Sequence, residues 1–115
     1  MKMTNIEAYE NLARMRNLTE TGKLGYAIAK NMRKIQTEIQ EYIDKRDGAA
    51  NKHGVVHEDG SFQIPADNVS AYLAEFSDLN DIENEIDIMT VNTETFCSGT
   101  LTSQDMYALE WMEEN

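Results

Sequence analysis

Apolar residues recur at steps of three and four positions between residues 24 and 43, which is the spacing of one face of an α-helix. The stripe consists of Leu24, Ile28, Met32, Ile35, Ile39, Tyr42 and Ile43. Charged residues occupy much of the opposite face. The pattern predicts one long amphipathic helix over 23–47, which Gly48 would end because glycine is common just after the end of a helix.

Two further segments carry the signature of a helix start. Thr4 and Glu7 have the spacing of a capping box and predict a helix over 5–16. Thr102 and Asp105 stand at the same spacing and predict a helix over 102–113. A fourth helix is expected over 67–80, where Asp67 is the candidate N-cap.

Residues 55–64 predict a β-hairpin, because the Asp-Gly pair at their centre suits a two-residue type I′ turn. In that register His57 pairs with Phe62, and Val55 pairs with Ile64. The turn and the apolar residues on either side of it thus predict two antiparallel strands joined directly to each other.

A third strand is expected over 85–91, where Ile86, Ile88 and Thr90 alternate with Asp87, Met89 and Val91. The sequence therefore predicts an α+β fold, in which the long amphipathic helix and three further helices pack with a small antiparallel sheet formed by 55–64 and 85–91. A chain of 115 residues is expected to form a single domain, 1–115, with a helical half 1–50 and an acidic mixed α/β half 51–115.

Charge is distributed unevenly along the chain. The net charge is −11, and all ten Lys and Arg lie between Lys2 and Lys52. Residues 53–115 contain fourteen Asp and Glu and no Lys or Arg. Such a stretch repels nucleic acid and anionic membranes and attracts basic surfaces. The alternative explanation is that the acidic residues only keep the protein dispersed in water.

Six carboxylates in this stretch are candidate partner-binding residues. Glu83, Glu85 and Asp87 stand at i, i+2 and i+4, so an extended strand places them on one face at spacings of roughly 6.6 to 6.8 Å. That spacing is comparable to the distance between neighbouring phosphates on a DNA strand. The sequence therefore favours a surface that acts as a decoy for a nucleic-acid site, although a solvated strand has the same spacing. The candidate set is Asp78, Asp81, Glu83, Glu85, Asp87 and Glu94.

No motif for catalysis or metal binding stands out. His53 and His57 have no nucleophile motif such as G-x-S-x-G near them, so both are expected at the surface. Two histidines and the single Cys97 are too few for a structural zinc site, and Cys97 is expected to be buried or unreactive. The segment from Asp78 fails the EF-hand pattern, because Glu83 stands where glycine is required. We therefore expect a protein that is not an enzyme and binds no cofactor.

Residues Lys23–Asn31, continuing to Glu38, are similar to the long helix of a group of small uncharacterised phage and prophage proteins, and the resemblance covers most of the chain. Ile86–Ile88 is similar to its strand, and Leu101–Asp105 with the ending Glu110–Glu114 is similar to its closing helix. In size and acidity the chain also looks like the phage-encoded anti-CRISPR inhibitors of type II systems, several of which occupy the DNA-binding surfaces of Cas9.

This resemblance implies a phage anti-defence protein that inhibits Cas9 or a similar nuclease through an acidic, DNA-mimicking surface. Its partner would be a protein with a basic nucleic-acid-binding surface, without direct binding of nucleic acid or membrane. The implied location is the cytoplasm of a bacterial host cell. The lack of an apolar run long enough for a signal peptide or a membrane span agrees with that location.

The alternative function is a phage morphogenesis or virion-associated structural protein that oligomerises through the long helix. The stripe from Leu24 to Tyr42 approximates a coiled-coil seam and would support this role. In a chain of this size, however, the stripe is expected to be consumed by the chain's own core. A monomer is therefore favoured over a homodimer.

Overall fold

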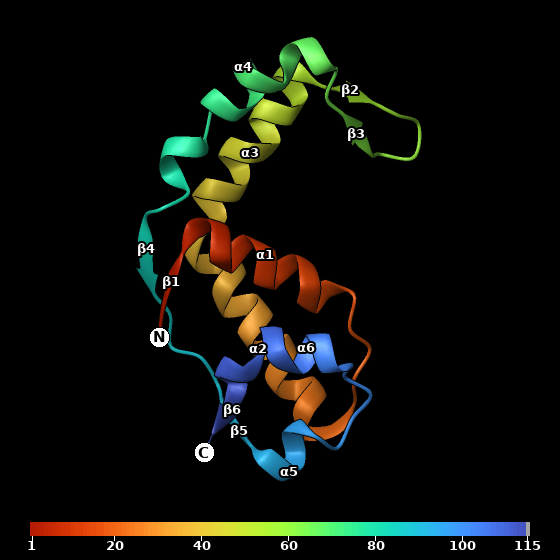
Figure 1. The fold of residues 1–115 in the computed structure, drawn as a ribbon, viewed down its shortest axis with the longest axis vertical. Coiled ribbons are helices and arrows are strands. Elements are labelled where there is room, and N and C mark those ends of the chain that lie inside the picture. Colours follow the sequence, from red (N-terminus) through yellow and green to blue (C-terminus); the bar gives the residue numbers. More distant parts are fainter. Residues whose placement is uncertain (115) are drawn as a thin grey trace.

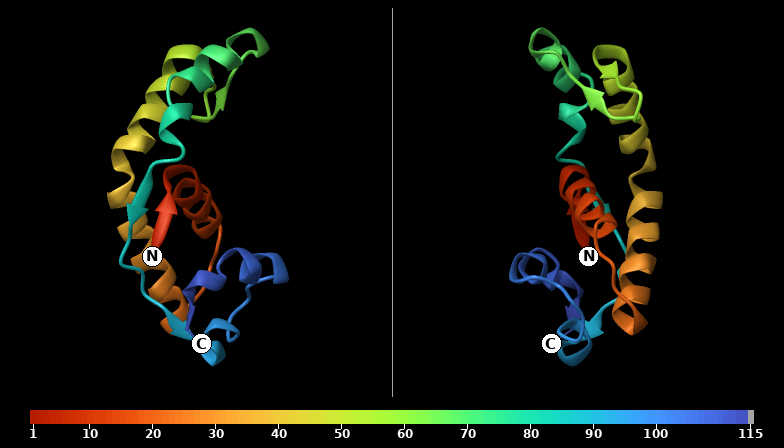
Figure 2. Two further views of the ribbon diagram at one scale, coloured as in Figure 1. Left: turned by 60° about the vertical axis from the view of Figure 1, so that its left-hand side comes forward. Right: turned by 90° about the vertical axis from the view of Figure 1, so that its right-hand side faces the viewer.

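The computed structural model describes residues 1–114 and has the predicted α+β fold. α2 (Gly22–Glu38) and α3 (Gln40–His53) form a curved spine along the long axis, and the other helices lie on its inner side (Figure 1 and Figure 2). The radius of gyration is 16.1 Å. Since a compact chain of about 100 residues has a radius of gyration of roughly 13 Å, the molecule is elongated.

The first helix has the predicted bounds. α1 spans Asn5–Arg16 and follows the short strand β1 (Lys2–Thr4). The Thr4 hydroxyl accepts a hydrogen bond from the Glu7 amide at 3.2 Å, and Glu7 Oε1 accepts one from the Thr4 amide at 3.2 Å. These two bonds complete the predicted capping box, which satisfies amide groups that have no partner within the helix.

The predicted single helix over 23–47 is two helices that meet at Ile39. The backbone of Ile39 has φ −104° and ψ 18°. Its amide still donates to the Ile35 carbonyl at 3.0 Å, and its own carbonyl accepts from the Ile43 amide at 3.0 Å. The spine therefore changes direction at this residue without a connecting loop.

Gly48 does not end the helix as predicted, because α3 continues to His53 and is followed by Gly54. A glycine inside a helix lowers its stability by about 1 kcal/mol relative to alanine but does not break it. The next two residues, Ala49 and Ala50, are buried and favour helix. At Gly54 a Cβ atom would lie 2.6 Å from the Ala50 carbonyl oxygen, so the close approach of the backbone requires glycine there.

The strands form three separate two-stranded sheets, so the predicted joining of 55–64 with 85–91 is wrong. The antiparallel pairs are β1 with β4 (Glu83–Glu85) and β2 (Val55–Val56) with β3 (Phe62–Gln63). A parallel pair joins β5 (Val91–Asn92) to β6 (Glu113–Glu114).

The predicted strand over 85–91 is interrupted because part of its backbone bonds to side chains of α2. Lys34 Nζ donates to the Asp87 carbonyl at 2.7 Å. Asn31 bonds both the amide and the carbonyl of Met89, at 2.7 and 2.9 Å. These contacts occupy backbone groups between β4 and β5 that a longer strand would use for pairing.

The hairpin register differs from the prediction, since Val55 lies opposite Gln63 and Val56 opposite Phe62. The connecting turn is longer than two residues, because the Asp59 carboxylate accepts hydrogen bonds from both the amide and the hydroxyl of Ser61, at 3.0 and 2.7 Å. A side chain that bonds the backbone two residues later forms a turn of its own.

The helix expected over 67–80 is replaced by three short pieces. They are η1 (Ala66–Asn68), α4 (Val69–Ala74) and η2 (Ser77–Leu79). Asp67 lies inside η1, and no side chain caps that turn, so its predicted N-cap role is wrong. The helix breaks before Ser77 and Asp78, which both have low helix propensity.

The closing helix is also shorter than expected. α6 (Ser103–Ala108) is followed by η3 (Glu110–Met112), and the predicted capping box between Thr102 and Asp105 is present. A further helix, α5 (Thr93–Phe96), was not predicted. The Asn92 side chain caps it by accepting from the Thr95 amide at 2.8 Å.

The apolar stripe of the spine lies in the chain's own core. Its buried members are Leu24, Ile28, Ile35, Ile39, Tyr42 and Ile43, and Met32 is half-buried. Residues from α1, η3 and the segments around Phe76 and Ile86 cover them. The stripe is therefore not exposed as a coiled-coil seam.

Within residues 1–114, none of the helices combines the length and the apolar character that crossing a membrane requires.

Candidate functional site

The acidic segment 78–87 is fixed against the start of the chain. In the β1–β4 pair, Thr4 lies opposite Glu83 and Lys2 lies opposite Glu85. The Ile86 amide donates to the Met1 carbonyl at 2.8 Å and so extends the pairing by one residue. The first three residues after Met1 thus hold the segment as an ordered edge of the molecule.

The start of α1 holds the same segment from its other end. The Asn5 amide donates to the Ile82 carbonyl at 2.9 Å, and the Ile6 amide donates to the Asn80 carbonyl at 3.1 Å. Amide groups in the first turn of a helix have no partner within the helix, so these bonds satisfy two of them. The backbone of the acidic segment therefore adds to the capping of α1 by Thr4.

Two asparagine side chains lock this contact. Asn5 is buried, and its amide nitrogen donates to the Leu79 carbonyl at 2.8 Å. The half-buried Asn84 donates to the Asn5 side-chain oxygen at 2.8 Å and to the Met3 carbonyl at 3.2 Å. Asn84 therefore points inward from β4, while its neighbours Glu83 and Glu85 point outward.

Five of the six predicted acidic residues lie along this edge, and all five are exposed. We refer to them as the acidic strip: Asp78, Asp81, Glu83, Glu85 and Asp87. The strip begins in η2, includes both ends of β4 (labelled in Figure 1) and finishes two residues after that strand. Glu83, Glu85 and Asp87 are thus all exposed, but β4 ends at Glu85, so the predicted placement of Asp87 on the same strand is wrong.

Two members of the strip already have cationic partners. Glu85 Oε1 lies 3.1 Å from the N-terminal ammonium group, and Asp87 Oδ2 lies 3.5 Å from Lys34 Nζ. Both carboxylates are well hydrated, with side-chain exposures of 70% and 99%, so these pairs contribute little to stability. Across residues 1–114, no ion pair involves Asp78, Asp81 or Glu83.

An apolar residue lies within the strip. Ile82 is 50% exposed and is flanked in sequence by Asp81 and Glu83. A large apolar side chain in solvent among charged groups has little to contribute to the free protein. At an interface the same side chain can act as an anchor that becomes buried while the charges around it set the orientation.

Glu94 does not belong to the strip. It lies on α5, which is at the lower end of the molecule in Figure 1, below β4. Its neighbours around a shallow hollow include Glu20, Lys23 and Ser98. Glu94 therefore lies apart from the other five acids, and the fold does not bring it into one surface with them.

The histidines and the cysteine are separate from one another. His53 Nε2 lies 3.0 Å from Glu75 Oε1 and ties the end of α3 to the segment after α4. His57 is exposed, with Nε2 3.2 Å from Gln63 Oε1. Cys97 is exposed and not buried. In the described part of the chain, no three His, Cys, Asp or Glu side chains are placed to hold a metal ion.

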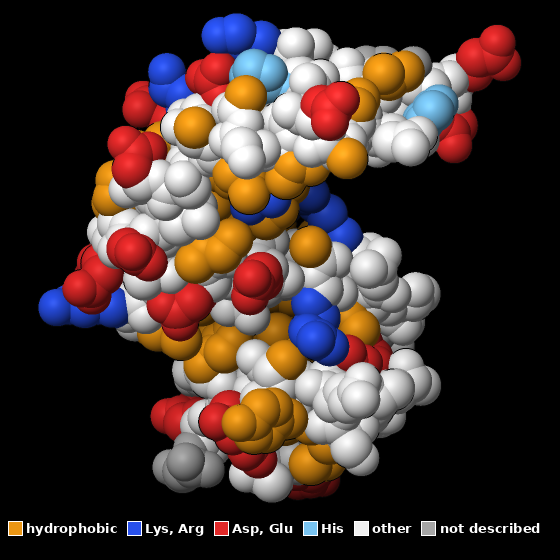
Figure 3. All heavy atoms as spheres, turned by 45° about the horizontal axis from the view of Figure 1, so that its top comes forward, with side chains coloured by type: hydrophobic (Ala, Val, Ile, Leu, Met, Phe, Trp, Pro, Cys, Tyr) orange, Lys and Arg blue, Asp and Glu red, His pale blue; other side chains and the backbone are white. Residues whose placement is uncertain are grey.

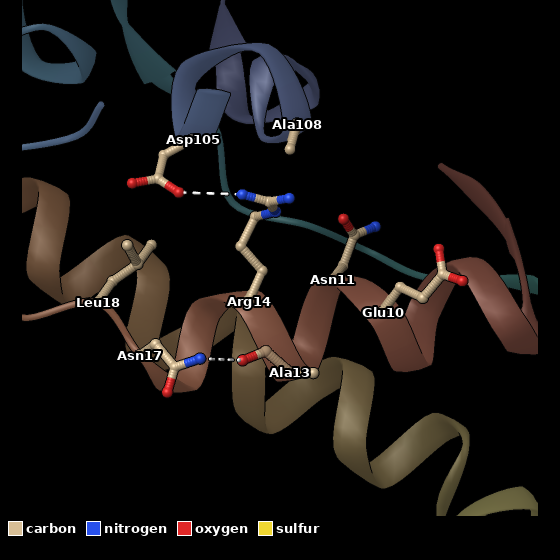
Figure 4. A pocket seen from close by; sticks show the side chains of 8 residues that line it. All are labelled: Glu10, Asn11, Ala13, Arg14, Asn17, Leu18, Asp105 and Ala108. Carbon is tan, nitrogen blue, oxygen red and sulfur yellow. Dashed lines mark hydrogen bonds and ion pairs between the residues drawn. The ribbon is translucent and has the colours of Figure 1, made fainter. Parts of the chain in front are cut away.

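A hollow of about 650 Å³ lies between α1 and α6 (Figure 4). Arg14 reaches across it and donates to Asp105 Oδ1 at 3.1 Å. Its lining residues are Glu10, Asn11, Ala13, Arg14, Asn17, Leu18, Asp105 and Ala108. None of them is a Ser, Cys or His that could begin nucleophilic catalysis.

Asp105 has a structural role in this hollow. Hydrogen bonds from the backbone and hydroxyl of Thr102, followed by the bond from Arg14, hold the pKa of the Asp105 carboxyl below its ordinary value of 3.8. The Asp105 carboxylate both caps α6 and connects α6 to α1. Its lowered pKa is therefore explained without a catalytic function.

We expect Asp105→Asn to lower the melting temperature at neutral pH, because the ionised carboxylate makes better bonds to Thr102 and Arg14 than an amide does. A carboxyl with a lowered folded-state pKa stabilises the fold above its unfolded pKa, and this stabilisation is lost as the pH falls through the folded pKa. The difference between wild type and variant should therefore shrink below pH 3.8 in circular dichroism melts. Replacement of an exposed carboxylate, Glu110→Gln, is the control. If Asp105→Asn lowered the melting temperature equally at neutral pH and at a pH below 3.8, this account would be contradicted.

The chain matches no family profile, and no curated protein or solved structure is significantly similar to it. The resemblance to phage proteins and to inhibitors of Cas9 therefore stays a prediction.

Proposed function

We propose that this protein acts by binding, and that the acidic strip occupies a basic, nucleic-acid-binding surface on a protein partner. The observation that carries the proposal is the ordered acidic edge. Backbone bonds to β1 and α1 fix the segment 78–87, while its carboxylates remain exposed. A fixed acidic edge can compete with nucleic acid for the same basic groups without any chemical step.

The spacing of the strip supports this role. Glu83 and Glu85 are two residues apart on β4, which separates them by roughly 6.6 to 6.8 Å along the strand. On one DNA strand the phosphates rise by about 3.4 Å per nucleotide while winding around the axis, so neighbouring charges are separated by a comparable distance. Asp78 and Asp81 continue the acidic row beyond the strand.

The distribution of ion pairs gives the members of the strip unequal weight in this proposal. The N-terminus and Lys34 partly compensate the charges of Glu85 and Asp87. Asp78, Asp81 and Glu83 have no such pair among the residues that the structure describes. We therefore assign the main contribution to these three, with Ile82 as the apolar anchor among them.

Cas9 is the partner that we propose on the basis of the resemblance to type II anti-CRISPR inhibitors. It reads its short recognition sequence with a pair of arginines and holds the guide–target duplex in a positively charged channel. Both surfaces complement an acidic strip in charge. The protein would then be a phage anti-defence factor that excludes target DNA inside the bacterial host.

No observation favours the alternative of a structural protein that oligomerises through its long helix. The apolar stripe that would form the seam is covered by other parts of the same chain. An exposed seam would be needed for that role.

The proposal is tested with the strip variant Asp78→Asn, Asp81→Asn and Glu83→Gln, which removes three charges and keeps the side-chain shapes. We expect wild-type protein to inhibit cleavage of target DNA by guide-loaded Cas9. The strip variant should associate with Cas9 about tenfold more slowly at low salt, because electrostatic steering raises association rates by roughly 10- to 1,000-fold. Association is measured by biolayer interferometry at about 0.05 and 0.2 M salt, since screening reduces the effect.

A matched control removes three exposed carboxylates outside the strip, through Glu41→Gln, Asp47→Asn and Glu110→Gln. Its net charge equals that of the strip variant, so it should behave like wild type if position matters. Equal slowing of both variants would mean that only total charge acts. Wild-type protein that neither binds nor inhibits Cas9 would reject this partner, and the strip is then tested by comparing the proteins that the two variants capture from bacterial lysate.

A further inference from the structure

The tip of the molecule carries a second exposed surface, which is apolar. The tip consists of the end of α3, the β2–β3 hairpin and α4 (Figure 1). Four of the eight large apolar side chains that are exposed among the described residues lie within 55–73. They are Val55 (52% exposed), Phe62 (44%), Val69 (39%) and Leu73 (45%). Figure 3 shows hydrophobic side chains across this end of the molecule.

α4 has two apolar faces and uses only one of them in the fold. Tyr72 turns inward, with its ring 5.1 Å from the ring of the buried Phe76. Val69 and Leu73 are one helical turn apart, so they share a different face, and that face is exposed. No residue of α4 is fully buried. The helix therefore packs through Tyr72 and leaves an apolar pair in solvent.

The hairpin carries one exposed apolar side chain on each of its two faces. Because Val56 lies opposite Phe62, and neighbouring residues on a strand alternate between faces, Val55 and Phe62 point to opposite faces of the hairpin. An occupant that covers Val69 and Leu73 therefore reaches at most one of them. The pair on α4 is the fixed part of the surface.

The charged residues of the hairpin and of α4 with its flanking segments are all acidic. Residues 54–76 contain Glu58, Asp59, Asp67 and Glu75 but no Lys or Arg. The adjacent Lys52 is already paired with Glu75 at 3.0 Å. An apolar surface with an acidic border complements an apolar segment with a basic border. A second copy would bring like charges together, and an anionic membrane would be repelled.

We propose that this apolar tip, centred on Val69 and Leu73, binds an amphipathic helical segment of a partner protein whose apolar face is flanked by Lys or Arg. An exposed apolar helix face commonly receives such a segment, with apolar residues one turn apart as anchors. The acidic border selects the basic flanks and excludes acidic segments. The inference does not rest on the acidic strip, so either surface can fail its test independently.

The test titrates the ¹⁵N-labelled 115-residue chain with a synthetic amphipathic helix of Leu and Lys and follows the amide signals by NMR. We expect shifts confined to the hairpin and α4. The variant Val69→Ser with Leu73→Ser should bind at least about tenfold more weakly, because two apolar side chains lose their burial in the complex. A peptide with the same composition in scrambled order and a Leu/Glu peptide should cause no comparable shifts.

The matched control is Tyr26→Ser with Tyr107→Ser, which removes two exposed aromatic side chains outside the tip, 61% and 80% exposed. It should bind the Leu/Lys peptide like wild type, and circular dichroism melts should show that both variants are folded. Shifts that lie outside the tip, or equal binding of the scrambled or Leu/Glu peptide, would overturn the proposal. So would light scattering that gives twice the 13.1 kDa chain mass for wild type but not for the tip variant, since the occupant would then be a second copy.

Discussion

Phe76→Ala is expected to lower the free energy of unfolding by about 3–5 kcal/mol, the usual cost of removing a buried phenylalanine. Phe76 is only 1% exposed and lies where the tip joins the rest of the molecule. Its ring packs edge-on against two tyrosine rings. The ring centres are 6.2 Å apart for Tyr42 of α3 and 5.1 Å apart for Tyr72 of α4. The truncation would leave a cavity at this junction.

The guanidinium of Arg46 adds to the expected loss. It lies 4.6 Å from the centre of the Phe76 ring and 4.0 Å from that of Tyr9 on α1. A cation over an aromatic face is stabilised by about 0.5–2 kcal/mol, depending on how far it is removed from water. Phe76→Ala therefore removes a contact of the half-buried Arg46 as well as apolar packing.

Urea denaturation followed by circular dichroism measures this loss. Phe76→Leu should cost less, because it refills most of the volume. Leu73→Ala is the control, since an exposed side chain nearby should change stability by no more than about 0.5 kcal/mol. A cost below about 1 kcal/mol for Phe76→Ala, or a second transition, would mean that the tip unfolds separately from the body.

The elements that the sequence predicted well depend on neighbours within one turn of helix. The capping boxes Thr4–Glu7 and Thr102–Asp105 are complete within four residues, and both helices begin where predicted. The apolar stripe of the spine likewise depends on local spacing. Such signals require no knowledge of how distant segments meet.

The errors arise where a distant segment decides the outcome. β1 is three residues long and pairs with β4 about 80 positions later, and no local pattern marks it as a strand. The strand predicted over 85–91 is interrupted by Lys34 and Asn31 of α2. Gly48 was assigned as a helix end from its type alone, whereas the burial of Ala49 and Ala50 carries the helix past it.

The candidate site divides in the same way. Alternation along the chain was sufficient to predict that Glu83 and Glu85 of β4 are both exposed, whereas Asp87 lies beyond the end of the strand. The ion pairs of Glu85 and Asp87 could not be predicted from the sequence, because their partners, the N-terminus and Lys34, are distant along the chain. Glu94 was grouped with the strip by charge alone. The fold separates it, since the chain passes through β5 before reaching α5.

Asn31 is a polar residue at 0% exposure in α2, and it bonds the chain far away in sequence. Its side-chain nitrogen donates to the Met89 carbonyl at 2.9 Å, and its side-chain oxygen accepts from the Met89 amide at 2.7 Å. The asparagine amide thus pairs with Met89 as a neighbouring strand would. Both groups of Met89 would be left without these partners if the amide were removed.

We expect Asn31→Leu to lower the free energy of unfolding by about 2–4 kcal/mol, because each buried backbone group left without a partner costs roughly 1–3 kcal/mol. Urea denaturation followed by circular dichroism measures the change. The matched control is Gln36→Leu, an exposed position on the same helix, which should change stability by no more than about 0.5 kcal/mol. Equal effects of the two substitutions would contradict a specific role for the bonds to Met89.

The variant Asn31→Asp separates hydrogen bonding from shape, since its side chain has nearly the same size as asparagine. Its carboxylate can still accept from the Met89 amide, but it faces the Met89 carbonyl without a proton to donate. Burial and this repulsion should raise the pKa of the new carboxyl in the folded state. A raised folded-state pKa means that the variant is least stable at high pH and regains stability as the pH falls through that pKa, because the protonated carboxyl can donate to Met89. Urea denaturation at several pH values tests this, and a stability difference from wild type that does not narrow toward low pH would show that the bond to the Met89 carbonyl contributes little.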